Sequence, residues 1–492
     1  MRFAAAWLLL STLLLSVRGV SAAADASPAS LRLQTRVSEV SNLVHWVDNL
    51  AGTSVGKTMP LYRRYWKQRF GVPDAGDREA LDAFVRIRRL RIGGGGKLGN
   101  RSGCLPIVET ELSWHQVFLA EAMQADSLQD FLRRLKPYLE AEDRAALEAA
   151  LRRFQGRFGA VWRDLSHVRR FETRFREFLD DGKLLGYLNS LAAFLDVDPA
   201  GLPPMQLSFM ALPSEGPTHA EADGDQLLIE IRPSDRPQQQ IQVVAHEAVH
   251  FLMRRMRPEQ LDLLADQAFR HGEMGLVLWS YLWEGIPTAL GQGLAEATLA
   301  RRSFSLRRSW YHRDAIDRFA KTVYPVLRDA VAAGRRLRDG VLPEAAAALA
   351  ASGKFREFPM ADALNVAVFV AGSGLEPLRD QLRRQLGTRA RGLSLPFTLD
   401  DPVARTWMER YSCLPAVVLA LGEQLPAVQA FLQSAGITKE KLDVVRQAAI
   451  PGGRLAVLPR PGGGYVFLLV APDHASALAL METFTLQRGL PD

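Results

Sequence analysis

The stretch His246-Glu247-Ala248-Val249-His250 decides the fold assignment of this chain of 492 residues. Residues four positions apart in an α-helix lie one turn from each other on the same face, so His246 and His250 can direct two imidazoles at one metal ion. Glu247 follows the first histidine and lies about 100° around the helix, where it can reach a metal-bound water instead of the metal. The spacing therefore predicts a helix that supplies two nitrogen ligands and a nearby general base.

The residues around this motif predict a buried helix with one reactive side. Its apolar face consists of Ile241, Val244, Ala245, Ala248, Val249, Leu252, Met253 and Met256. The opposite side carries Val243, His246, Glu247, His250 and Arg254. Pro233 precedes the helix, and Ser234 or Asp235 is expected to cap its first turn. Such a helix suits the wall of a cleft.

Two strands are expected ahead of the motif helix. In 205–209 and again in 227–231, apolar residues alternate with their neighbours, as in half-buried strands. Ahead of these strands, residues 27–200 have mostly helical periodicity. One example is 128–139, which follows a possible N-cap at Ser127. We therefore expect an α+β fold that is predominantly helical, with a small β-sheet next to the motif helix.

The pattern along the chain divides it into five segments. They are a signal peptide (1–24), an N-terminal helical region (27–200), a catalytic core (201–300), a C-terminal helical region (301–450) and a small ββα tail (451–492). The tail is expected to hold strands at 455–458 and 465–470, followed by a helix from about Asp473 to Gln487.

The N-terminus is typical of an exported protein. Met1-Arg2 precedes an apolar run at 3–17, and small residues follow at 21–26, which is the succession found in cleaved signal peptides. The apolar run is short for a membrane span. We therefore expect a periplasmic or secreted protein without a membrane anchor. In that compartment Cys104 and Cys413, the two cysteines of the chain, are predicted to form a disulfide.

The charge of the chain does not point to nucleic acid. The formal net charge is +7 and the pI is about 9.5. However, the basic residues are scattered in pairs such as Arg133/Arg134 and Arg152/Arg153, and no basic block is interleaved with aromatics. A solvated cationic surface explains this pattern, so no nucleic-acid partner is expected.

Downstream of the motif, the segment Trp283-Glu284-Gly285 places a carboxylate among apolar residues. The motif together with this later Glu-Gly pair resembles the gluzincin clan of zinc metallopeptidases, over roughly 205–300. The resemblance implies a zincin-like α+β core, one Zn²⁺ held by His246, His250 and Glu284, and Glu247 as general base. The chain departs from many clan members at Thr288, where they place an aspartate that orients a ligand histidine.

Other residues compete for the position of third ligand. They are His271, Glu273 and Glu296. His271 lies in a polar, glycine-containing stretch that is typical of a loop, and ligands are held better by rigid elements. Glu284 lies in apolar surroundings, where a carboxylate needs a pairing partner or a metal. Glu284 is therefore our predicted third ligand.

The expected activity is hydrolysis of a peptide or protein substrate by a zinc-activated water. Members of the clan often use a tyrosine or histidine to stabilise the oxyanion, and the candidates here are Tyr311, His312 and Tyr324. Two alternatives stay open. One is hydrolysis of a non-peptide amide or ester, and the other is a helical envelope binding protein in which zinc is structural or lost.

Overall fold

The computed structural model describes residues 30–54, 56–90, 114–299, 304–353, 367–386, 394–410, 415–438, 442, 452–460 and 465–486. The predicted signal peptide and both cysteines lie outside these residues. Within them, helices predominate over strands, and the fold is α+β as expected. No helix in the described part of the chain is both long and apolar enough to span a membrane.

The first sheet has four strands in the order β1-β2-β4-β3, with bounds Leu33–Arg36, Met205–Ala211, Gln226–Ile231 and Ala220–Asp223. Strands β1, β2 and β4 are parallel, and β3 pairs antiparallel with β4 as an edge strand. The predicted strands at 205–209 and 227–231 are confirmed as β2 and β4. Strands β1 and β3 were not predicted, because each has only four residues and no strong alternation.

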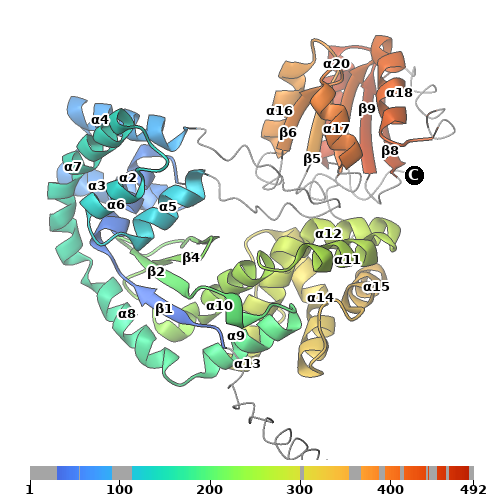
Figure 1. The fold of residues 1–492 in the computed structure, drawn as a ribbon. Helices are drawn as coiled ribbons and strands as arrows, with labels where there is room; N and C mark the ends of the chain where they lie inside the picture. Colours follow the sequence, from blue (N-terminus) through green and yellow to red (C-terminus); the bar gives the residue numbers. More distant parts are fainter. Residues whose placement is uncertain are drawn as a thin grey trace, which may run out of the picture.

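Helices cover both faces of this sheet (Figure 1). The N-terminal helices are α2 (Glu39–Ala51), α3 (Met59–Phe70), α4 (Ala75–Arg88), α5 (Trp114–Gln124), α6 (Leu128–Arg134), α7 (Ala141–Asp164), α8 (Ser166–Leu179) and α9 (Lys183–Phe194). The Phe171 ring of α8 lies 5.1 Å from that of Phe209 in β2. Phe209 is aligned with Ile229, so the next residue of β4, Glu230, faces the other side of the sheet, where it contacts His45 of α2.

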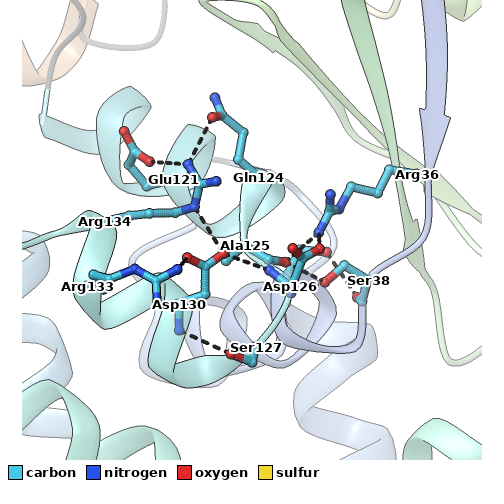
Figure 2. Close-up of polar contacts among 11 residues, drawn as sticks. Arg36, Ser38, Glu121, Gln124, Ala125, Asp126, Ser127, Asp130, Arg133 and Arg134 are labelled. Carbon is cyan, nitrogen blue, oxygen red and sulfur yellow. Dashed lines mark hydrogen bonds and ion pairs between the residues drawn. The ribbon is translucent and has the colours of Figure 1, made fainter.

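The turn between α5 and α6 is tied to the end of β1 by polar contacts (Figure 2). The Ala125 carbonyl accepts hydrogen bonds from Arg36 at 2.8 Å and from the Ser38 hydroxyl at 3.2 Å. Arg36 also pairs with Asp126 at 2.5 Å. Ser127 caps α6 as predicted, because its Oγ accepts from the backbone N–H of Asp130. These contacts tie the end of β1 to the α5–α6 turn, while β1 itself pairs with β2.

The motif helix α10 (Pro237–Met253) begins one or two residues later than the predicted caps, Asp235 and Ser234, imply. Its N-cap is Arg236, and Pro237 occupies the first turn, where a missing N–H costs nothing. The prediction of Ser234 or Asp235 as cap is wrong. The Asp235 carboxylate instead accepts from the backbone and guanidinium of Arg232.

Helices α11 to α15 follow the motif helix, and α12 and α13 pack directly against it. Their bounds are Pro258–Phe269 (α11), Gly272–Pro287 (α12), Ala295–Leu299 (α13), Asp314–Ala332 (α14) and Val341–Ser352 (α15). A π-helical segment, η2 (Thr288–Leu294), connects α12 to α13 and packs extensively on α10. Pro287 stands at the junction of α12 and η2.

The C-terminal part forms a second sheet in the order β6-β5-β7-β9-β8. Its strands are β5 (Ala367–Ala371), β6 (Ser394–Thr398), β7 (Ala416–Leu421), β8 (Arg454–Pro459) and β9 (Tyr465–Ala471). Helices α16 (Glu376–Leu386), α17 (Pro402–Arg410), α18 (Leu425–Ser434) and α20 (His474–Leu486) accompany them. Apolar cores lie on both faces of this sheet.

This sheet corrects the expected organisation of 301–492. The strands β8 and β9 and the closing helix were predicted, but the prediction that 301–450 is entirely helical is wrong. Strands β5, β6 and β7 lie in that region and join the tail in one sheet. Strand β7 is an unbroken apolar run, because parallel strands covered on both faces need no polar alternation. Periodicity cannot distinguish such a run from a buried helix.

Candidate metal centre

Helix α10 brings both motif histidines to one point. His246 and His250 are buried, with 6% and 8% of their surfaces exposed. Their Nε2 atoms lie 3.2 Å apart, and their ring planes are inclined by 70°. The four-residue spacing has thus produced the predicted convergence of two imidazole nitrogens.

Glu284, in the last turn of α12, completes a cluster of three. Its Oε2 lies 3.7 Å from Nε2 of His246 and 3.6 Å from Nε2 of His250. One potential ligand atom from each residue lies within 4.8 Å of the others. Two zinc ligands at 2.0–2.1 Å in tetrahedral geometry lie about 3.3 Å apart, close to the distances in this cluster. The three side chains can therefore hold one metal ion, and the His₂Glu donor set is one that zinc accepts.

Two of the rival third ligands, His271 and Glu296, lie outside the cluster. His271 is exposed at the start of α12. Glu296 is fully buried but pairs with Arg308. The side chain of Glu273 lies outside what the structure describes. Among the described residues, the cluster contains His246, His250 and Glu284 alone.

The electrostatics of the cluster favour a bound cation. Burial by itself lowers the pKa of His246, but the hydrogen bond and charge of Glu284 and the charge of Glu247 outweigh it, and the pKa is raised. Burial likewise acts to raise the pKa of Glu284, yet the two histidines hold that pKa well below its ordinary value. Glu284 is therefore ionised because of the two histidines, although burial alone would favour its protonated form.

Of the three proposed oxyanion donors, Tyr311 lies at the cluster. Its hydroxyl donates to Oε2 of Glu284 at 3.1 Å, and its ring stacks near His246 with 6.1 Å between centroids. The backbone N–H of Tyr311 donates to Asp317, which fixes the segment ahead of α14. The exposed ring of His312 lies 4.5 Å from that of Tyr311.

Tyr324 does not have the surroundings of an oxyanion donor. It is 4% exposed, and its ring packs against Phe304 at 5.2 Å and Trp310 at 5.3 Å. Burial raises the pKa of its hydroxyl. The structure thus assigns Tyr324 to the apolar core, and the expectation of a donor there is not supported.

Glu247 is buried at 7% exposure and adjoins a charge network that the sequence did not reveal. Nε2 of His219 and Nε2 of His115 each lie 3.6 Å from the same oxygen of Glu221 in β3. Burial lowers the pKa of His219, but the hydrogen bond to Glu221 and the charges of Glu221, Glu230 and Glu247 raise it to about 9. His219 is therefore a cation at neutral pH, and it interacts electrostatically with the carboxylate of Glu247.

A second carboxylate anchors this network in the core. Glu230 is fully buried and lies 2.8 Å from Nε2 of His45. It also accepts hydrogen bonds from Thr58 at 2.8 Å, Tyr62 at 3.0 Å and the backbone N–H of His219 at 2.7 Å. His45 and His115 could not be placed from the sequence, because their carboxylate partners come from distant segments, whereas His219 lies only two positions from Glu221. Glu230 gave a local signal of this network, because it is a carboxylate within the otherwise apolar strand predicted at 227–231.

Comparisons with protein-family models, with curated proteins and with solved structures found no match to this chain. The function of this protein is therefore inferred from the chemistry of the His246, His250 and Glu284 cluster.

Proposed function

We propose that the protein is a zinc-dependent hydrolase of the peptidase type, with His246, His250 and Glu284 as the metal ligands. The observation that carries this proposal is the convergence of two imidazoles and one carboxylate within 4.8 Å, with Glu247 adjacent to the first ligand on the same helix. A zincin-like core, and kinship with the gluzincins, are part of the proposal.

The chemistry divides between the metal and the chain. Zinc bound at such a site polarises the scissile carbonyl and lowers the pKa of its bound water. Glu247 accepts the proton of the attacking water and returns it to the leaving amine. Tyr311, whose hydroxyl already lies at Glu284, is the best-placed donor to the developing oxyanion.

The number of ligands supports catalysis over a structural role. Structural zinc sites are usually closed by four protein ligands, whereas catalytic sites keep a position for water. Within the described ranges, no fourth His, Cys, Asp or Glu joins the cluster. This favours an enzyme over the alternative of a binding protein with structural zinc.

The position of β3 favours a peptide over other amides or esters as the substrate. This strand is the edge of its sheet and packs against α10. An edge strand presents unpaired backbone groups, with which an extended peptide can form main-chain hydrogen bonds. Export to the periplasm or the exterior, proposed from the N-terminal sequence, would bring the enzyme to protein substrates there.

Metal analysis of the purified protein, followed by digestion of a mixed peptide library with and without chelator, tests the proposal. We expect about one zinc per chain and cleavage that stops on chelation and returns with added zinc. The Glu247→Gln variant serves as the control for contaminating peptidases. Cleavage of ester or non-peptide amide substrates alone would favour the other hydrolase class, and a zinc-free protein would contradict the proposal.

A further inference from the structure

The helix that carries Glu284 changes its winding about one turn after this residue. Helix α12 ends at Pro287, and the chain continues without a break as the π-helical segment η2. Proline has no N–H with which to continue the α-helical hydrogen bonds, so a change of winding here has a local cause. Short π-helical segments inside helices occur frequently at functional sites.

The backbone of η2 touches the backbone of the first ligand. A Cβ atom placed on Gly291 would lie 2.4 Å from Cα and 2.5 Å from N of His246. Contacts below 3.0 Å essentially never occur for real Cβ atoms, so any other residue at 291 would push η2 and α10 apart by more than half an ångström. Gly291 is thus the point at which the two helices meet, directly behind a metal ligand.

Two hydrogen bonds hold the segment in this position. The buried hydroxyl of Tyr187, from α9, donates to the Leu290 carbonyl at 2.7 Å. The Thr288 hydroxyl donates to the Glu284 carbonyl at 2.7 Å, which joins the start of η2 to the residue that supplies the third ligand. The backbone of η2 immediately ahead of the contact with His246 is therefore held in place.

We propose that η2 is the positioning element of the metal centre, and that it fixes His246 relative to Glu284 through the contact at Gly291. This inference rests on the proposed metal site. Many gluzincins orient a ligand histidine with an aspartate side chain at the position of Thr288. In this chain, backbone packing would orient the histidine instead. In support, the backbone of Pro287, where α12 meets η2, interacts with the imidazole of His246, so the same segment also contacts the ring of this ligand.

Separation of η2 from α10 would displace a ligand without removing any donor atom. A metal ligand must be held within about half an ångström of its productive geometry. Groups that support the ligands typically account for about 10- to 100-fold in metal affinity. Gly291→Ala should therefore weaken metal binding by an amount in this range although His246, His250 and Glu284 are all present.

The test is a set of Zn²⁺ and Co²⁺ dissociation constants, measured by competition with a chelating dye on the full chain. Gly159→Ala is the matched control, because this helical glycine in α7 has no atom within 4 Å of an added Cβ. Tyr187→Phe is a second variant that removes the hydrogen bond to Leu290 and keeps the ring. We expect weaker binding for Gly291→Ala and Tyr187→Phe, an altered Co²⁺ absorption spectrum for Gly291→Ala, and wild-type affinity for Gly159→Ala.

A folded Gly291→Ala variant with wild-type affinity would overturn the inference. If circular dichroism shows that this variant does not fold, Tyr187→Phe decides: unchanged affinity overturns the inference and weakened affinity supports it. Wild-type protein that binds metal but cleaves no peptide contradicts the proposed function and leaves the affinity comparison valid. Wild-type protein that binds no metal overturns both.

Discussion

Replacing Glu284 by alanine removes one of the three proposed ligands and leaves the other two in place. Its Oε2 lies 3.7 and 3.6 Å from the two histidine Nε2 atoms, so the change empties one side of the cluster. Structural zinc sites with four ligands bind with roughly 10–16 kcal/mol, or about 3–4 kcal/mol for each ligand if the ligands contribute equally. Because 1.4 kcal/mol corresponds to a factor of ten, we expect zinc affinity to fall by about 100- to 1,000-fold.

The assay is zinc competition against a chelator of known affinity, with the thermal melting of the metal-free proteins as a check on folding. His271→Ala is the control, because His271 is an exposed imidazole outside the cluster and its loss should leave the affinity unchanged. The assignment of Glu284 as the third ligand is wrong if Glu284→Ala keeps wild-type zinc affinity while His271→Ala loses zinc. The proposed kinship with gluzincins would then fail as well.

Other predictions concern the base, the charge network and the cysteines. Glu247→Gln should reduce hydrolysis by at least about 100-fold with unchanged zinc content, because the amide cannot accept the proton; a variant that keeps most of its activity would show that Glu247 is not the base. The pKa of His219 is raised from 6.5 to about 9, so its contribution to the free energy of unfolding should be complete below pH 6.5 and lost as the pH rises to about 9. The pKa of Glu221 is lowered, chiefly by the two histidines acting against burial, so its contribution is present above pH 4.5 and lost as the pH falls. Urea unfolding from pH 5 to 9 should therefore show a smaller alkaline loss of stability in His219→Gln than in the wild type, and equal losses would contradict this. Finally, Cys104 and Cys413 should give no reactive thiols after denaturation without reductant, and two thiols would exclude the disulfide.

The sequence alone determined the features whose cause is local. The four-residue spacing of His246 and His250 fixed their convergence, because helix geometry sets the direction of side chains within one turn. Alternation identified β2 and β4, and the hydroxyl of Ser127 marked the start of α6. Glu284 could be selected because an ionised carboxylate in an apolar segment requires a partner.

Tertiary structure decided the features that depend on distant segments. The candidates Tyr311 and Tyr324 look alike in sequence, yet one lies at Glu284 and the other in the apolar core. In the charge network at Glu247, His219 and Glu221 are close in sequence, but only the fold brings His115 to Glu221 and Glu247 near His219. Strands β5, β6 and β7 of the C-terminal sheet were missed for a similar reason, since parallel strands are defined by pairing across the chain. Hydrogen bonds and charges act over a few ångströms in space, and only the folded chain determines which residues come that close.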